Sequence, residues 1–180
     1  MALTLLLGGA RSGKSALAVR MAAAVGTTGA PVVVIATAEA RDQEMAARIA
    51  RHRAQRPSGW ITVEAPMELG AALDGADPAS FVIVDCLTLW VTNLGEHLDD
   101  AEVIERAGAA AAVAAARPGP TVVVSNEVGS GIVPFDPAVR AWRDLLGSVN
   151  TTWATVADRV ALVVAGRVLP LSRAEDMLHG

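Results

Sequence analysis

The chain has 180 residues, a length that predicts one domain over residues 1–180, since single domains usually span about 100–200 residues. With 15 basic and 19 acidic residues its formal net charge is −4, which excludes a polycation that binds nucleic acid or an anionic membrane through bulk charge. The single cysteine, Cys86, excludes a disulfide framework and a zinc site built from Cys pairs. No apolar run approaches the roughly 20 residues of a membrane span, and the N-terminus lacks the basic region and cleavage site of a signal peptide. We therefore expect a cytoplasmic protein with no nucleic-acid partner and no membrane span.

Short apolar runs alternate with helical patterns along the chain, which predicts an α/β fold with a mostly parallel sheet flanked by helices. The runs are rich in Val and Ile without polar alternation, as expected of strands that are buried on both faces. They cover residues 3–7, 31–36, 81–84, 121–124 and 160–164, with a weaker, edge-like strand at 60–64. Helices are predicted near 14–25, 41–55, 67–73, 87–97, 100–116 and 137–157, and the polar tail 171–180 is expected to fray.

The strongest motif is a phosphate-binding loop (P-loop) directly after the first predicted strand and directly before the first predicted helix. Its sequence, GGARSGKS, matches G-x-x-x-x-G-K-[ST]. Successive backbone N–H groups of such a loop hold phosphate oxygens, its lysine reaches the β- and γ-phosphates, and its hydroxyl holds Mg²⁺. The motif predicts that the chain binds a nucleoside triphosphate through Gly8, Gly9, Ala10, Arg11, Ser12, Gly13, Lys14 and Ser15.

Acidic and polar residues follow several of the predicted strands. Asp85 ends the apolar run at 81–84, which is the usual position of the carboxylate that orients the metal in P-loop enzymes. Ligands of open α/β sheets bind beyond the carboxyl ends of the strands. We therefore expect the P-loop, residues 36–38, Asp85 and residues 125–127 to meet at one edge of the sheet.

Residues 44–57 form an arginine-rich helical segment that contains His52 and ends at Pro57. His52 shares a helix face with Met45 and Ile49, so a half-buried structural ring is one interpretation. The other is a site that binds an anion such as a polyphosphate, because neighbouring guanidinium groups repel one another unless an anion lies among them.

The segment 125–134, SNEVGSGIVP, is too rich in glycine for a core element and is interpreted as a shaped loop. Glu127 in this loop is a candidate for handling a proton or a metal-bound water. A flexible surface loop is the alternative.

Together these segments resemble one family over essentially all of the chain, from residue 3 to about 164. The matching motifs are GGARSGKS, IATA at 35–38, RIARHRAQRP at 48–57, DCLT at 85–88 with VTNL at 91–94, and SNEVGSGIVP. The chain looks like a bifunctional adenosylcobinamide kinase/adenosylcobinamide-phosphate guanylyltransferase of cobalamin biosynthesis. That resemblance implies a RecA-like P-loop fold and a homo-oligomer such as a trimer, with its site between subunits.

The resemblance implies two reactions. In the first, ATP or GTP phosphorylates the aminopropanol hydroxyl of adenosylcobinamide; in the second, GTP transfers GMP to that phosphate through a guanylyl-histidine. His52 is the position that matches the nucleophile, although some relatives have two adjacent histidines where this chain has Arg51-His52. The catalytic residues implied are His52 and Lys14, with Mg²⁺ at Ser15 and Asp85. The nucleotide contacts implied outside the P-loop are Ala36, Thr37, Ala38, Arg53, Ala54, Gln55, Arg56, Glu64 and Asp85.

Two other functions are compatible with a P-loop. The first is a monofunctional small-molecule kinase in which the arginine-rich helix clamps phosphate and no histidine is needed. The second is a RecA-like motor or switch acting on nucleic acid, which predicts a basic surface and stacking aromatics. The net charge of −4, the lack of Tyr and the presence of only two Phe disfavour the motor.

Overall fold

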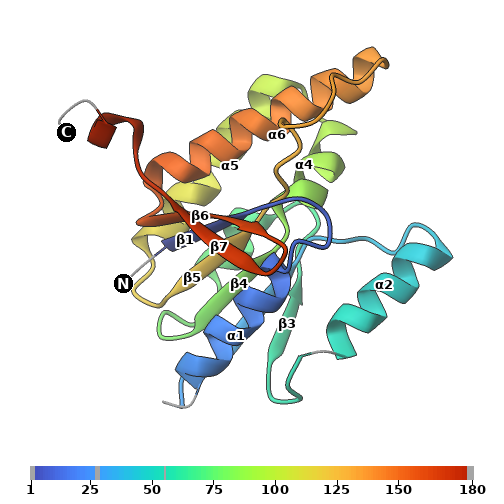
Figure 1. Ribbon diagram of the computed structural model, residues 1–180. Coiled ribbons are helices and arrows are strands. Elements are labelled where there is room, and N and C mark those ends of the chain that lie inside the picture. Colours follow the sequence, from blue (N-terminus) through green and yellow to red (C-terminus); the bar gives the residue numbers. More distant parts are fainter. Residues whose placement is uncertain (1–2, 27–28, 55, 178–180) are drawn as a thin grey trace.

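The computed structural model describes residues 3–26, 29–54 and 56–177. Their centre is a seven-stranded sheet with the order β3-β2-β4-β5-β1-β6-β7 (Figure 1). All neighbouring strands pair in parallel except β6 and β7, which form an antiparallel hairpin. The structure therefore confirms the mostly parallel α/β sheet.

The strands lie close to the positions that the apolar runs predict. Their bounds are β1 Leu3–Leu7, β2 Val32–Ala36, β3 Ile61–Glu64, β4 Phe81–Asp85, β5 Thr121–Val124, β6 Arg159–Val164 and β7 Arg167–Leu171.

The six predicted helices are all present and differ from the prediction by a few residues at their ends. Their bounds are α1 Lys14–Gly26, α2 Gln43–Ala54, α3 Leu69–Asp74, α4 Leu87–Gly95, α5 Asp100–Ala116 and α6 Pro137–Val156, followed by a short 3₁₀ helix, Ala174–Met177.

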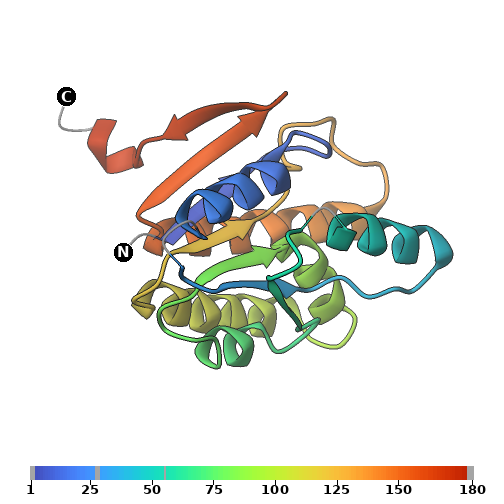
Figure 2. The ribbon, with the colours of Figure 1, turned by 90° about the horizontal axis from the view of Figure 1, so that it is seen from below.

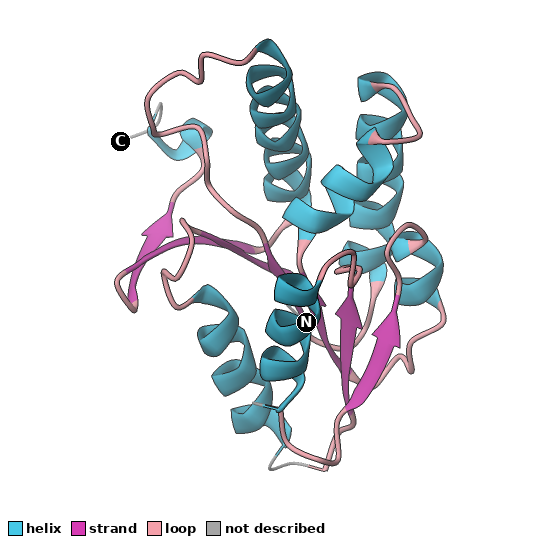
Figure 3. Cartoon of the chain, turned by 90° about the vertical axis from the view of Figure 1, so that its right-hand side faces the viewer, coloured by secondary structure: helices cyan, strands magenta, loops and turns pink. Residues whose placement is uncertain are grey.

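Helices cover both faces of the sheet (Figure 3). The larger core cluster joins one face to α3, α4, α5 and α6 and includes the fully buried Trp90 and Trp153. The smaller cluster joins the other face to α1 through Ala18 and Ala22. The strands β1, β2, β4 and β5 are buried along almost their whole length because helices cover both of their faces.

The helix α2 is the exception to this layered packing. None of its residues is buried, and it projects from the body of the molecule on the right of Figure 1. Figure 2 shows the same projection from below. The position of α2 therefore depends on contacts at its ends and on the few side chains that it turns toward the sheet.

The C-terminal part of the chain departs from the prediction. The strand β6 was expected to be buried on both faces, but only Ala161 and Val163 are buried in it. It lies near the end of the sheet, where helices do not cover both faces. The hairpin partner β7 was not predicted, because its exposed sequence RVLPL lacks a buried-strand pattern. The tail from residue 171 was expected to fray; within it the structure describes the exposed 3₁₀ helix Ala174–Met177, and residues 178–180 lie outside the described residues.

Strand register brings polar positions to one level at the carboxyl edge of the sheet. Glu64 pairs with Ala36, Ala36 pairs with Asp85, and Asp85 pairs with Val124. The P-loop follows β1, which is the next strand beside β5. The expectation that these strand ends meet at one edge is confirmed.

Among the described residues, none of the helices combines the length and hydrophobicity that crossing a membrane requires.

Candidate active site on the P-loop edge of the sheet

The P-loop between β1 and α1 needs glycine at two positions. Gly8 has φ +156°, and a Cβ there would lie 2.4 Å from the carbonyl oxygen of Val163. Gly13 has φ +99°, a conformation that L side chains rarely adopt. The loop after β5 contacts this turn, because the backbone N–H of Glu127 donates to the carbonyl oxygen of Gly8 at 3.1 Å. These two glycine conformations and this hydrogen bond fix the conformation of the turn.

Lys14 begins α1 and lies inside the loop. It is 7% exposed, and its Nζ donates to the carbonyl oxygen of Gly9 at 2.9 Å. Burial lowers the pKa of Lys14, while the nearby Cys86 and Asp85 act in the opposite direction. A buried ammonium group with one carbonyl partner has unused donors, which suits a polyphosphate oxygen.

Asp85 at the end of β4 is the centre of the site. Its Oδ1 accepts from Ser15 Oγ at 3.4 Å, and its Oδ2 lies 3.7 Å from His52 Nδ1 and 3.5 Å from Arg56 Nη2. Burial raises the pKa of Asp85, but His52, Arg56 and the Ser15 hydroxyl together lower it further, so the net shift is downward. Asp85 is therefore an ionised carboxylate that joins the P-loop to the segment carrying His52.

The C-terminal end of α2 is held to the sheet edge by arginines. Arg53 donates to Glu64 Oε1 at 2.6 Å, and Arg56 Nη1 donates to Thr62 Oγ1 at 3.3 Å. Burial lowers the pKa of Arg56, and the charge of Asp85 partly offsets this effect. These contacts place His52 above Asp85.

A cavity of about 170 Å³ lies between α2 and the carboxyl edge of the sheet. It is smaller than the about 300–1,000 Å³ of typical ligand pockets. Its lining comprises Lys14, Ser15, Ala36, Ala38, Met45, Arg48, Ile49, His52, Arg53, Arg56, Glu64, Asp85, Cys86, Thr88, Leu89, Val124 and Asn126.

Comparison with known proteins shows the family of this chain. The family model described as cobinamide kinase / cobinamide phosphate guanyltransferase matches residues 4–171. The chain belongs to this family. Within it, the chain is 44% identical over 168 residues to the bifunctional adenosylcobalamin biosynthesis protein CobP of Pseudomonas aeruginosa, covering 93% of this chain and 95% of that protein. It is 41% identical to each of the proteins named CobU from Escherichia coli and Salmonella typhimurium, over 90% of this chain and 95% of each relative.

Half of the residues expected from the P-loop motif and from the resemblance to the cobinamide kinase / cobinamide phosphate guanyltransferase family line the cavity: Lys14, Ser15, Ala36, Ala38, His52, Arg53, Arg56, Glu64 and Asp85. The first six residues of the P-loop, 8–13, are not part of its lining. Thr37 does not line it: Thr37 is fully buried, and its hydroxyl both donates to the carbonyl oxygen and accepts from the N–H of Cys86, at 2.7 and 2.9 Å. Ala54 ends α2 outside the lining, and Gln55 lies outside the described residues.

Glu127 lies apart from this cavity and lines a second one, between α6 and the C-terminal segment. Its carboxylate accepts from the N–H groups of Gly129 and Ser130 at 2.6 and 3.2 Å. These contacts shape its own loop.

The cavity also contains residues of this family member that were not singled out as site residues from the sequence. Arg48 faces the cavity from α2, while Thr88 and Asn126 come from α4 and the loop after β5. The backbone N–H of Asn126 donates to Thr88 Oγ1 at 2.8 Å, which joins these two segments. Arg48 belongs to the arginine-rich segment, and Thr88 and Asn126 lie in motifs on which the resemblance rests. The sequence therefore marked all three segments but did not assign these residues to the site.

Proposed function

We propose that this chain phosphorylates the aminopropanol hydroxyl of adenosylcobinamide with ATP or GTP. It then transfers GMP from GTP to the resulting phosphate, giving adenosylcobinamide-GDP and pyrophosphate. The observation that carries the proposal is the meeting of a P-loop lysine, a strand-end carboxylate and a helix histidine around one cavity. The bifunctional names of the relatives support the same pair of reactions.

The kinase reaction uses the P-loop. Its backbone N–H groups and Lys14 bind the β- and γ-phosphates, and the lysine charge stabilises the transferring phosphoryl group. The substrate hydroxyl oxygen attacks the γ-phosphorus, the bond to the β-phosphate oxygen breaks, and the nucleoside diphosphate leaves. The hydroxyl proton goes to solvent or to the phosphate, so this reaction requires no histidine.

The guanylyl transfer uses His52. Nδ1 of His52 faces Asp85, which leaves Nε2 as the nucleophile. The Nε2 lone pair forms a bond to the α-phosphorus of GTP, and pyrophosphate leaves with the electron pair of the broken P–O bond. A phosphate oxygen of adenosylcobinamide phosphate then attacks the same phosphorus and breaks the P–N bond, which restores the imidazole.

The positive charge on and next to α2 suits the two displacements at the α-phosphorus in guanylyl transfer. Arg48, Arg53 and Arg56 line the cavity with His52. Guanidinium groups at this position bind phosphate oxygens and stabilise negative charge that develops in the transition state.

We also propose Mg²⁺ as the metal of the site. The described residues contain no group of three or more His, Cys, Asp or Glu side chains arranged to hold a metal. Magnesium needs no such group, since it is usually bound by one or two protein oxygens with substrate phosphates and water. Ser15 Oγ and Asp85 Oδ1, 3.4 Å apart, are hard oxygen donors that fit this pattern. When bound, Mg²⁺ neutralises charge on the phosphates.

We further propose a cytoplasmic homo-oligomer, and specifically a trimer. Nucleoside triphosphates are its substrates, which favours the cytoplasm. Exposed apolar side chains support association: Ile132 and Phe135, in the loop before α6, are 97% and 100% exposed. The strand β7 is exposed along its whole length at one end of the sheet.

The deciding experiment incubates the purified protein with adenosylcobinamide and each triphosphate, and separates the corrinoid products by chromatography. We expect adenosylcobinamide phosphate with ATP or GTP, and adenosylcobinamide-GDP only when GTP is present. Formation of the phosphate alone, with GTP in excess, would instead indicate a monofunctional kinase.

The variant Lys14→Ala tests the shared nucleotide site. Loss of the lysine charge should abolish phosphorylation of adenosylcobinamide, and should weaken guanylyl transfer to supplied adenosylcobinamide phosphate. Guanylyl transfer at the wild-type rate would show that the two reactions do not share the P-loop.

A further inference from the structure

The helix that carries His52 has little packing of its own to fix its position. No residue of α2 is buried, and the helix projects from the molecule (Figure 1). Contacts at its C-terminal end join Arg53 to Glu64 and Arg56 to Asp85. The direction of the helix also depends on the segment that leads into it, residues 37–42, which we call the α2 connector.

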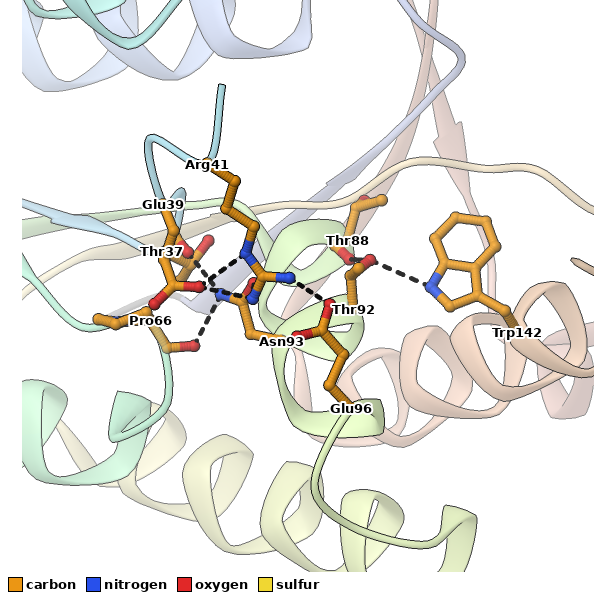
Figure 4. Close-up of polar contacts among 9 residues, drawn as sticks. All are labelled: Thr37, Glu39, Arg41, Pro66, Thr88, Thr92, Asn93, Glu96 and Trp142. Carbon is orange, nitrogen blue, oxygen red and sulfur yellow. Dashed lines mark hydrogen bonds and ion pairs between the residues drawn. The ribbon is translucent and has the colours of Figure 1, made fainter. Parts of the chain in front are cut away.

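Asn93 on α4 holds the beginning of the α2 connector. It is 4% exposed, and its Nδ2 donates to the carbonyl oxygens of Thr37 at 2.8 Å and Pro66 at 3.0 Å (Figure 4). Its Oδ1 accepts from Arg41 at 3.2 Å. Only an amide side chain supplies two donors and an acceptor in this arrangement. Asn93 thus joins the ends of β2 and β3 to α4.

Arg41 holds the other end of the α2 connector. Its Nε and Nη2 donate to Glu39 Oε2 at 2.9 and 2.6 Å, Nη2 also donates to Asn93, and Nη1 donates to Glu96 (Figure 4). These hydrogen bonds to Glu96 and Glu39 raise the pKa of Arg41. Isolated exposed ion pairs contribute little to stability, whereas a guanidinium whose three nitrogens all have partners is fixed in direction.

The α2 connector continues directly into the helix. Asp42 caps α2, because its Oδ1 accepts from the N–H of Met45 at 2.7 Å. The residue before this cap is Arg41, so a shift of Arg41 changes the starting direction of α2. From Gln43 to His52 the helix rises about 14 Å, at 1.5 Å per residue, so a tilt of about 10° displaces His52 by about 2 Å.

We propose that Asn93 and Arg41 are positioning residues that fix the direction of α2 and thereby hold His52 over the P-loop. The inference rests on the proposed guanylyl transfer through His52. The guanylyl step depends on the position of α2, whereas phosphoryl transfer from the P-loop does not use His52. Loss of the Arg41 contacts should therefore slow formation of the guanylyl-histidine and leave the kinase step in place.

The test compares Arg41→Gln with Arg106→Gln. Arg106 is a matched control, because its side chain is 43% exposed, like that of Arg41, and it makes an ion pair with Glu68 at 3.2 Å. We expect Arg41→Gln to slow covalent labelling by α-³²P-GTP about tenfold or more, since a misplacement of about 1 Å can cost on the order of 100-fold. Its kinase kcat should stay within about twofold of wild type, and Arg106→Gln should leave both rates unchanged.

Two further measurements separate positioning from general stability. Amide hydrogen exchange should rise in α2 of Arg41→Gln but not in α5 or α6, and Tm should stay close to that of wild type. Glu96→Gln should slow labelling in the same way, and Arg41→Gln/Glu96→Gln should cost little more than either single change. Asn93→Leu should show the same selectivity; if it does not fold, the exposed Arg41 and Glu96 variants still decide.

Labelling of Arg41→Gln at the wild-type rate, or equal loss of both activities, would overturn the positioning role. If the wild-type protein itself takes no label from α-³²P-GTP, the proposed function fails instead. In that case the hydrogen-exchange measurement still shows whether the contacts of Arg41 hold α2 in position.

Discussion

Nδ1 of His52 lies 3.7 Å from Oδ2 of Asp85, and the ring lines the cavity. The carboxylate favours a proton on Nδ1 and so leaves the Nε2 lone pair free. This arrangement supports the proposed role of His52 as the nucleophile, although its helix has no buried residues.

His52→Asn should remove guanylyl transfer and retain phosphorylation. Wild-type protein incubated with α-³²P-GTP and Mg²⁺ should keep label after denaturation, and γ-labelled GTP should leave none. The label should be labile in acid and stable in base, as expected of a phosphoramidate and not of an acyl phosphate. His97→Asn, at an exposed position outside the cavity, is the control and should label normally.

Two results would count against the covalent mechanism. Full guanylyl transfer by His52→Asn would exclude His52 as the nucleophile. Equal loss of both activities would indicate that His52 positions nucleotide in general.

The ionisation of Asp85 can be tested with a single substitution. Burial raises its pKa, but His52, Arg56 and Ser15 lower it below its ordinary value of 3.8. Since the unfolded chain binds the proton more readily, this carboxylate stabilises the fold above about pH 3.8 and loses that contribution as the pH falls through the lowered folded-state pKa.

Asp85→Asn should therefore flatten the pH dependence of unfolding below about pH 4, measured by urea titration at several pH values. The same variant should need a much higher Mg²⁺ concentration for activity, because one hard oxygen donor is weakened. Asp144→Asn, on an exposed carboxylate paired with Arg143 at 3.0 Å, is the control. An unchanged Mg²⁺ titration would remove Asp85 from the metal site.

At the scale of elements, the buried Arg117 joins the end of α5 to the end of α3 and to the turn before β4. It follows α5, is 8% exposed, and donates to the carbonyl oxygens of Leu73, Ala76, Asp77 and Ser80 at 2.8–3.4 Å. These acceptors come from the end of α3 and the turn that leads into β4. The guanidinium thus supplies donors to carbonyl groups of these two segments, of which the Asp77 carbonyl also accepts from the N–H and hydroxyl of Ser80.

Arg117→Met should lower the free energy of unfolding by about 2–4 kcal/mol, because several buried carbonyls lose a charged donor. Urea unfolding at pH 7 measures the loss. Arg106→Met, at a 43% exposed side chain, should change stability by less than about 0.5 kcal/mol. A similar small effect of Arg117→Met would mean that water satisfies the carbonyls equally well.

At the scale of the whole molecule, the exposed apolar residues Ile132 and Phe135 predict self-association. Static light scattering should give a mass that is a multiple of 18.5 kDa, with a trimer as the proposed state. Phe135→Ser should shift the equilibrium toward smaller species, whereas Ile104→Ser, on α5 and 38% exposed, should not. A wild-type mass of 18.5 kDa would exclude the oligomer.

The amino-acid sequence determined the parts of this protein that depend on local pattern. The buried runs at β1, β2, β4 and β5 predicted strands because residues covered on both faces cannot alternate with polar ones. The P-loop could be identified because its glycines and lysine act within eight consecutive residues. For the same reason the exposed strand β7 was missed, since nothing in its own pattern marks it as a partner of β6.

Only the tertiary structure decided which distant residues meet. Strand order and register put Glu64, Asp85 and Val124 at one level, and the end contacts of α2 bring His52 within 3.7 Å of Asp85. From the sequence, Thr37 is among the expected nucleotide contacts, and Asn93, in the VTNL motif, has no assigned role. The structure shows that the Thr37 hydroxyl bonds to the backbone of Cys86 and that the Asn93 amide bonds to the carbonyl oxygens of Thr37 and Pro66. These hydrogen bonds join segments as much as 56 residues apart, which no local pattern specifies.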